Sequence, residues 1–285
     1  NIYNTYDYWS MDIYEGRKGG RIMNGKRRVS LLFFILVMIF FYMPIIMLVI
    51  LSFNQSKNFI WTGFSLKWYV ELFTSSPDLW QAFGRSIIIG LTSSIFSVIV
   101  ATFGAIGIKW YNTKIRNYVK FLNYIPLILP DLIIGVALLI FFNMQVGLYK
   151  GIELGMTTVF IAHTTFNIPF SLFIIMARLE EFDYSIIEAS RDLGATELQT
   201  LFKVIIPAMM PGIMSAFLMA MTLSLDDFVI TSFVTGTNSN TLPVQIYSMI
   251  KFGVSPVINA LSTILIIGTI VLSLSSRKLQ KYMLR

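Results

Sequence analysis

Residues 187–207 read I-E-A-S-R-D-L-G-A-T-E-L-Q-T-L-F-K-V-I-I-P and lie between two long apolar segments. The apolar residues of this stretch recur at helical spacings, which predicts an amphipathic pair of short helices. Gly194 has no side chain and tolerates a positive φ, so it suits a bend between the two helices. Pro207 marks the beginning of the next apolar segment. We call residues 187–207 the elbow.

An amphipathic elbow needs a surface to lie against, either lipid headgroups or another protein. A helix that binds lipid headgroups carries mostly Lys and Arg on its polar face. Here the acidic residues Glu188, Asp192 and Glu197 accompany Arg191 and Lys203. The mixed charge therefore favours a protein partner.

The composition is typical of a membrane protein. Hydrophobic residues make up 55% of the chain and charged residues 13%, with a mean hydropathy of +0.70. The fold class is therefore predicted to be all-α integral membrane, with six transmembrane helices. The predicted spans are residues 29–53, 84–108, 119–142, 155–177, 208–234 and 258–275. No metal site is predicted, because the chain has no cysteine and a single histidine.

The predicted domain organisation is a tail followed by one membrane domain. Residues 1–28 are polar and basic at their end, and they are expected to form a flexible tail. Residues 1–22 are expected to be an upstream extension, because Met23 begins a sequence that would make a natural start. The membrane domain is predicted to cover residues 29–285, with a coupling loop at residues 178–207.

The positions of the basic residues predict the orientation in the membrane. With the amino terminus inside, 17 of the 22 Lys and Arg residues fall on the inner side of the six spans. Inner segments of membrane proteins carry such an excess. Both termini and the elbow are therefore predicted to be cytoplasmic. The same distribution accounts for the net charge of +7, so no nucleic acid partner is expected.

The fifth predicted span contains the sequence S-L-D-D-F. An ionised carboxylate within a span costs at least ~2.5 kcal/mol, so it should face the interior of a helix bundle or a wet cavity. On one helix, neighbouring residues point about 100° apart. Asp227 then shares a face with Ser224 and Thr231, and Asp226 shares one with Thr222. At least one carboxylate is predicted to line a substrate path, with Asp227 preferred; the alternative is a structural role.

Two further groups of polar residues lie in the predicted spans. The carboxylates of Asp226 and Asp227 suit a cationic substrate, and the ring of Phe228 can add cation–π attraction. His163 and Asn167 stand four residues apart in the fourth span, where an interhelical hydrogen-bonded pair is predicted and a proton relay is the alternative. Asp131 follows Pro130 and is predicted to bond amides freed by a broken helix.

Two motifs resemble known membrane proteins. The elbow resembles the EAA loop of ABC importer permeases, with Ser190 where that family usually has Ala; the matching positions are Glu188, Ala189, Gly194, Val204, Ile206 and Pro207. The sequences S-L-D-D-F-V-I-T-S-F-V-T-G and L-P-V-Q-I-Y-S-M-I-K-F-G-V-S-P-V-I-N-A resemble PotC-type permeases of spermidine/putrescine importers. The chain is identified as a member of the type I, MetI-like permeases.

The resemblance implies a non-catalytic permease subunit that moves polyamines through the bacterial cytoplasmic (inner) membrane. It implies docking of a cytoplasmic ABC ATPase dimer at Glu188, Ala189, Ser190, Gly194 and Pro207. It also implies a substrate path at Asp226, Asp227, Ser224 and Thr231. The expected partners are that ATPase, which holds ATP and Mg²⁺, a second homologous permease, an extracytoplasmic polyamine-binding protein and membrane lipid. No cofactor is expected in this chain.

Three alternatives remain open at this point. The first is a permease of the same fold for another organic cation. The second is an ion-coupled secondary transporter that uses Asp226, Asp227 and His163, which inverted repeats and paired broken helices would support. The third is a membrane scaffold whose elbow recruits a partner other than an ATPase. Co-purification of an ATPase would separate the first alternative from the other two.

Overall fold

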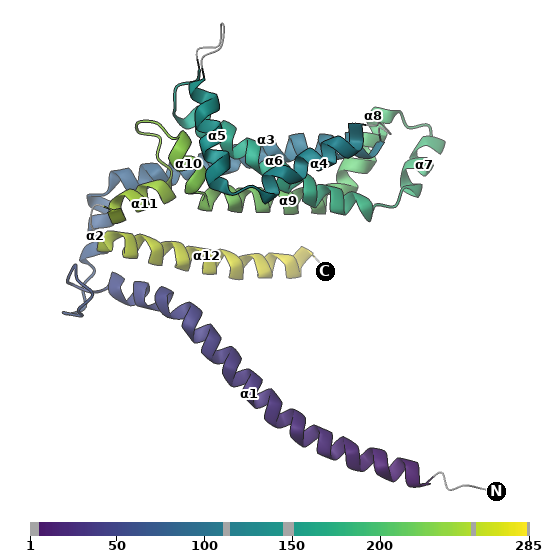
Figure 1. Ribbon diagram of the computed structural model, residues 1–285, viewed down its shortest axis with the longest axis horizontal. Coiled ribbons are helices and arrows are strands. Elements are labelled where there is room, and N and C mark those ends of the chain that lie inside the picture. Colours follow the sequence, from purple (N-terminus) through teal and green to yellow (C-terminus); the bar gives the residue numbers. More distant parts are fainter. Residues whose placement is uncertain (1–5, 111–114, 145–150, 252–254, 284–285) are drawn as a thin grey trace. The chain divides into compact units, whose positions relative to one another are not determined.

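The computed structural model describes residues 6–110, 115–144, 151–251 and 255–283. Within these residues the chain is helical apart from loops and one isolated antiparallel bridge between Asn54 and Phe64. The all-α prediction is therefore confirmed for the part of the chain that is described. Figure 1 labels the helices, which are α1 Tyr6–Ser52, α2 Lys67–Thr74, α3 Pro77–Trp110, α4 Ile115–Ile128, α5 Asp131–Asn143, α6 Met156–Glu180, α7 Ser185–Asp192, α8 Glu197–Thr200, a π-helical turn Leu201–Ile205, α9 Ile206–Asp226, α10 Val229–Val234, α11 Leu242–Lys251 and α12 Pro256–Met283.

All six predicted spans fall on helices. Four described helices are long and apolar enough to cross a membrane, namely Arg27–Ser52, Pro77–Lys109, Met156–Glu180 and Glu197–Asp226. A fifth span is present if the bent pair Phe121–Ile128 and Asp131–Asn143 counts as one. The sixth predicted span lies in α12, whose apolar part, Pro256–Val271, is shorter than the other four.

The chain divides into two compact units. One, which we call the terminal unit, is Asn1–Ser75 with Val254–Arg285, and the other, which we call the bundle unit, is Ser76–Gly253. Residues 6–28 are helical and continue into the first span as part of α1. The tail at residues 1–28 and the membrane domain at residues 29–285 stay predictions.

The third span is broken as predicted, at Pro130. The helical axis turns by 109° between α4 and α5, because proline lacks an N–H and disfavours helical geometry in the residue before it. Pro130 itself is extended, with φ −61° and ψ 138°. A second predicted break, at Pro126, is not observed, since Pro126 lies inside α4.

The fifth span was predicted as one helix, and this prediction is wrong. Helix α9 ends at Asp226, Asp227 is extended with φ −64° and ψ 121°, and α10 begins two residues later. The Asp227 carboxylate accepts hydrogen bonds from the amides of Ile230 and Thr231. An aspartate that bonds amides ahead of it offers the backbone an alternative to continuing the helix.

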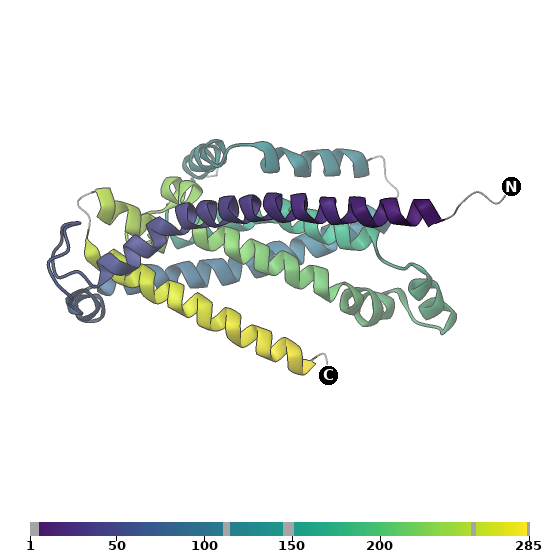
Figure 2. The same cartoon turned by 90° about the horizontal axis from the view of Figure 1, so that it is seen from below.

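The bundle unit is built around three helices that run side by side. Figures 1 and 2 both show α3, α6 and α9 together, with α7 and α8 at one end of the bundle and α10 and α11 at the other. Its core mixes alanines with larger side chains: Val98, Ala101, Ala105, Leu172, Ile175, Leu179, Ile187, Ile205, Met209, Ala216 and Ala220. Small residues let helices in a membrane approach closely.

The terminal unit contains α1, α2 and α12, and α12 contacts both of the other helices. Its loop between α1 and α2 is tied together by Asn54, whose amide nitrogen donates to the carbonyls of Asn58 and Ile60 at 2.9 Å each. The indole nitrogen of the buried Trp68 donates to the Asn54 carbonyl at 2.6 Å. These bonds give partners to backbone carbonyl groups of a loop that lies outside any helix or sheet.

The broken halves α5 and α10 pack against each other through Gly135. A Cβ atom added at Gly135 would lie 2.7 Å from Cδ2 of Phe233 and 3.4 Å from Cα of Ile230. The absence of a side chain at this position therefore allows the two short helices to touch.

We predict that Gly135→Ala destabilises the protein by about 1–3 kcal/mol, because the added methyl group overpacks this contact. The measurement is the midpoint of thermal unfolding of the detergent-solubilised protein. The matched control is Gly107→Ala on α3, where an added Cβ would meet nothing within 4 Å. An equal loss of stability in both variants would contradict the prediction.

Candidate functional site

The elbow folds into two short helices with a turn at Gly194, as predicted. Gly194 has φ +81°, and its amide donates to the Arg191 carbonyl at 2.8 Å. Thr196 then begins α8: its hydroxyl accepts the Gln199 amide at 3.3 Å, and the Gln199 side chain accepts the Thr196 amide at 3.0 Å. A left-handed glycine after one helix and a capping box before the next fix the turn.

The residues predicted to dock an ATPase differ in their exposure. Glu188, Ala189, Gly194 and Pro207 are exposed on the elbow, whereas Ser190 is only 8% exposed. The Ser190 hydroxyl donates to the Ile187 carbonyl at 2.8 Å and bonds the Thr200 hydroxyl at 3.0 Å. Ser190 therefore holds α7 against α8 from inside.

Large apolar side chains are exposed on the same elbow. Leu193 is 89% exposed, Leu198 69% and Phe202 56%. A shallow depression beside them is lined by Ser190, Leu193, Gly194, Ala195, Gln199, Lys203 and Val204. Leu193, Leu198 and Phe202 belong to the apolar residues that recur at helical spacings along the elbow, which the sequence predicts to lie against a partner. Exposed apolar patches of this kind mark interaction surfaces.

The segment that leads into the elbow is held by Asp183. Its carboxylate accepts the amide of Ser185 at 3.0 Å, directly before α7. This bond and the Ser185 hydroxyl hold the pKa of the Asp183 carboxyl below its ordinary value. Arg178, at the end of α6, pairs with Glu181 at 3.1 Å on the surface.

At the other end of the bundle, the fully buried side chain of His163 bonds both sides of the break in the fifth span. Its Nδ1 lies 2.5 Å from the Ser224 hydroxyl and its Nε2 lies 2.8 Å from the Thr231 hydroxyl. The Asp227 carboxylate is 3.4 Å from Nε2. Interhelical hydrogen bonding by His163 is thus confirmed. For Asn167 the prediction is wrong, because its side-chain amide has no hydrogen-bond partner among the described residues.

The structure brings together three of the predicted path residues, Ser224, Asp227 and Thr231, and buries them. Exposure is 4% for Ser224 and 0% for Thr231, and the Asp227 side chain is 7% exposed. Asp227 accepts the Thr231 amide at 2.8 Å and the Thr231 hydroxyl at 2.6 Å. The face that these residues share lies against α6.

Asp226 lies elsewhere, on the exposed side of α9. No other residue in the described part of the chain donates a hydrogen bond to its carboxylate. Thr222 and Ser215 share the exposed side, and each of their hydroxyls donates to a carbonyl of its own helix at 2.8 Å. Sequence reasoning placed Thr222 beside Asp226 but missed Ser215.

A second carboxylate, Asp131, is exposed at the beginning of α5. It lies near enough to Asp226 for the two negative charges to repel each other. Its predicted structural role is wrong, because the amides of Ile133 and Ile134 donate to the Pro130 carbonyl instead. The two exposed carboxylates therefore belong to the two broken spans.

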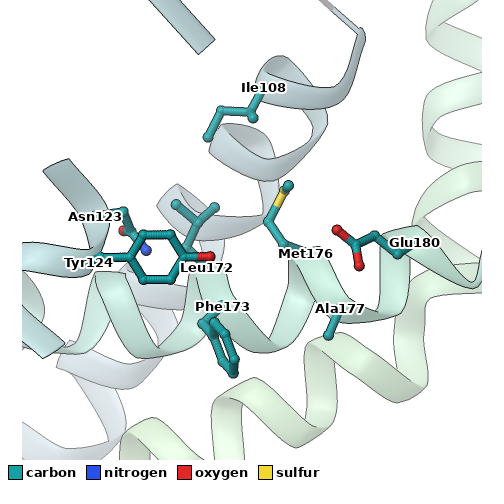
Figure 3. A pocket seen from close by; sticks show the side chains of 8 residues that line it. All are labelled: Ile108, Asn123, Tyr124, Leu172, Phe173, Met176, Ala177 and Glu180. Atoms are coloured by element: carbon teal, nitrogen blue, oxygen red, sulfur yellow. The ribbon is translucent and has the colours of Figure 1, made fainter. Parts of the chain in front are cut away.

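A pocket outside the predicted site opens between α3, α4 and the last turns of α6. Figure 3 shows its lining of Ile108, Asn123, Tyr124, Leu172, Phe173, Met176, Ala177 and Glu180. The Asn123 amide is occupied, since it donates to the Pro169 carbonyl at 3.3 Å. The walls are mainly apolar, and Asn123, Tyr124 and Glu180 contribute the polar side chains.

Comparisons with known proteins agree with the helical architecture. Residues 97–285 match the family model described as "Binding-protein-dependent transport system inner membrane component". Over 259 residues the chain is 35% identical to "Spermidine/putrescine transport system permease protein PotC" of Escherichia coli (strain K12), covering 90% of this chain and 94% of that protein. It is 41% identical over 237 residues to "Putrescine transport system permease protein PotI" of the same strain, covering 81% and 83%.

Two solved structures share the fold. One is a bacterial ABC transporter involved in the import of the acidic polysaccharide alginate, with a TM-score of 0.67, 18% identity and coverage of 91% of this chain and 97% of the other. The second is the MetNI methionine ABC transporter in inward-facing conformations, with a TM-score of 0.57, 20% identity and coverage of 74% and 96%. These likenesses confirm the predicted MetI-like fold, and the family match confirms the predicted resemblance to importer permeases. The chain therefore belongs to the family of inner membrane components of binding-protein-dependent transport systems.

Proposed function

We propose that this chain is the membrane-spanning permease subunit of an ATP-driven importer that moves polyamines into the cytoplasm. The observation that carries the proposal is the acidic break in the fifth span, where the exposed Asp226 faces no competing cation in the described part of the chain. Asp131 adds a second exposed carboxylate nearby. Polyamines carry several ammonium groups, and carboxylates within a membrane favour such cationic partners. The two relatives named as spermidine/putrescine and putrescine permeases support this substrate class.

The elbow is the proposed docking surface for a cytoplasmic ABC ATPase dimer. Ala189 and Gly194 are small and exposed, which allows close approach, and Glu188 is available to a basic residue of the partner. The exposed Leu193 and Leu198 provide the apolar area that a stable interface needs. ATP and Mg²⁺ belong to that partner, so this chain carries no cofactor and no catalytic residue. Closure of the ATPase pair then moves the elbow and opens the path outward.

The remaining partners follow from an importer of this class. A six-span chain supplies half of a pathway, so we propose a second homologous permease, and we propose an extracytoplasmic polyamine-binding protein that delivers substrate. Both termini and the elbow are proposed to be cytoplasmic. The exposed apolar side chains of α9, such as Met214 and Leu218, suit lipid or the second permease.

An ion-coupled secondary transporter is a second candidate function, because the structure contains two broken spans, at Pro130 and at Asp227. Paired broken helices are typical of that class. Membership in a family that depends on binding proteins argues against it. A permease of the same fold for another organic cation remains the nearer alternative, and the uptake experiment below separates it from a polyamine importer.

The first prediction is ATP-dependent uptake of labelled spermidine or putrescine. The complete complex is purified through a tag on this chain and reconstituted in proteoliposomes. The binding protein is added outside, and ATP is enclosed inside with the ATPase. The double variant Asp226→Asn/Asp227→Asn is expected to reduce uptake at least tenfold at equal protein level, because both carboxylates at the break lose their charge. Competition by unlabelled choline or arginine serves as the control for other organic cations. Wild-type complex with bound ATPase but no polyamine uptake would remove polyamines as the substrate.

The second prediction concerns the docking surface. Gly194→Trp is expected to abolish co-purification of the ATPase and ATP-dependent uptake, because the indole blocks close approach and the position requires φ +81°. Gly194→Asn separates the two causes, since Asn tolerates the left-handed conformation but adds a side chain. The control is Lys57→Trp in the loop between α1 and α2. Normal ATPase binding by Gly194→Trp would contradict docking at the elbow.

The third prediction concerns orientation. The chain contains no cysteine, so a single introduced cysteine reports the side on which it lies. In right-side-out spheroplasts, a membrane-impermeant maleimide is expected to label Lys57→Cys at once and Leu193→Cys only after permeabilisation. Labelling of Leu193→Cys in sealed spheroplasts would place the elbow outside and overturn the proposed topology.

A further inference from the structure

We propose that His163 is a positioning residue for substrate passage and that the two adjacent aspartates of the fifth span have different tasks. His163, Ser224, Asp227 and Thr231 form a buried cluster, which we call the latch. The latch fixes the break between α9 and α10, and this break presents Asp226 as the carboxylate that meets the substrate. The inference rests on the proposed function and deepens it.

A single imidazole ring bridges both sides of the break. Ser224, which bonds Nδ1, lies in the last turn of α9, whereas Thr231, which bonds Nε2, lies in α10. His163 itself comes from α6, a helix of the bundle core. The ring therefore anchors two separate helix ends to one rigid neighbour.

The direction of each hydrogen bond follows from the donors available. The Thr231 hydroxyl donates to the Asp227 carboxylate at 2.6 Å, so it is an acceptor towards His163 and Nε2 carries the proton. Nδ1 lies 2.5 Å from the Ser224 hydroxyl and bonds it. The Ser93 hydroxyl lies 3.3 Å from the Ser224 oxygen and bonds it in turn. Every member of the latch therefore has a hydrogen-bond partner.

Asp227 is committed to the latch and is poorly placed to hold a substrate ammonium. Its carboxylate accepts the Ile230 amide at 3.2 Å, the Thr231 amide at 2.8 Å and the Thr231 hydroxyl at 2.6 Å. Its side chain is 7% exposed. A substrate therefore has little access to these oxygens, which already accept the bonds that begin α10.

Asp226 has the opposite surroundings. It is exposed, no other described residue bonds its carboxylate, and it continues the exposed side of α9 that carries Ser215 and Thr222. Asp131 lies near enough to repel it. Two negative charges on this side attract a polycation more strongly than either charge alone. Asp226 is the last residue of α9, and the backbone leaves helical geometry at Asp227.

The test compares apparent KM and kcat for spermidine uptake by the complete complex in proteoliposomes. KM is the decisive quantity because it does not depend on how many complexes are active. Asp226→Asn is expected to raise KM at least tenfold with kcat within about twofold of wild type. The matched variant Asp227→Asn removes the same charge one residue away and is expected to lower kcat and thermal stability while KM changes less than threefold.

His163 is tested by two substitutions of different hydrogen-bonding capacity. His163→Leu is expected to raise KM at least fivefold, because Asp226 is no longer held in place. Adding Asp226→Asn to it should raise KM no further, since the two residues act on one interaction. His163→Gln retains a donor and an acceptor and should recover most of the wild-type KM. The control is Thr165→Leu on an exposed part of α6, with wild-type KM expected.

Three results would overturn the inference. The first is a wild-type KM in Asp226→Asn. The second is a rise in KM for Asp227→Asn in place of Asp226→Asn, which would make Asp227 the substrate carboxylate. The third is a loss of kcat alone in both His163 variants, which indicates a purely structural histidine. Wild-type complex that transports no polyamine would instead overturn the proposed function together with this inference.

Discussion

The end of the bundle at α10 depends on the buried His163, whose ring bonds α9 and α10 across the break between them. The His163 ring bonds the Ser224 hydroxyl at the end of α9 and the Thr231 hydroxyl in α10. Polar groups buried in a membrane protein are costly unless they are bonded in this way. The imidazole satisfies both hydroxyls and lies against the Asp227 carboxylate. One side chain from α6 thus makes a broken span compatible with a packed core.

The same arrangement links the two broken spans to each other. Helices α5 and α10, the short halves after each break, meet where Gly135 leaves room for Phe233. Each break also leaves one exposed carboxylate, Asp131 at the beginning of α5 and Asp226 at the end of α9. The interruptions therefore place charge where a continuous apolar helix would have none. This is how irregular backbone within a membrane protein commonly serves a path.

Much of the architecture was predictable from local signals, and the rest depended on contacts between distant residues. The turn at Gly194 and the break at Pro130 follow from the backbone chemistry of those residues, so both predictions were confirmed. The break at Asp227 was not predicted, because an S-L-D-D-F sequence continues a helix as readily as it ends one. The structure shows the break held by the Asp227 carboxylate, which accepts the amides ahead of it, and by the bonds of Ser224 and Thr231 to the His163 ring.

The candidate site shows the same division. Periodicity correctly grouped Asp227 with Ser224 and Thr231, but it could not show that this face lies against α6. Likewise, Ser190 was read as a small surface residue, and its burial depends on a hydroxyl ten residues away on Thr200. Patterns along the chain define which residues share a face, whereas tertiary packing decides whether that face is covered.

The internal bond between Ser190 and Thr200 has a mechanical consequence for the elbow. Together with the turn at Gly194 and the cap at Thr196, it joins α7 and α8 into a stiff lever whose free end carries Leu193. A lever of this kind transmits displacement instead of absorbing it by bending. The π-helical turn Leu201–Ile205 joins this lever to α9, and its wider ring of backbone bonds holds an extra residue per turn. A displacement of the tip would therefore reach α9 along the chain through the five residues of that turn.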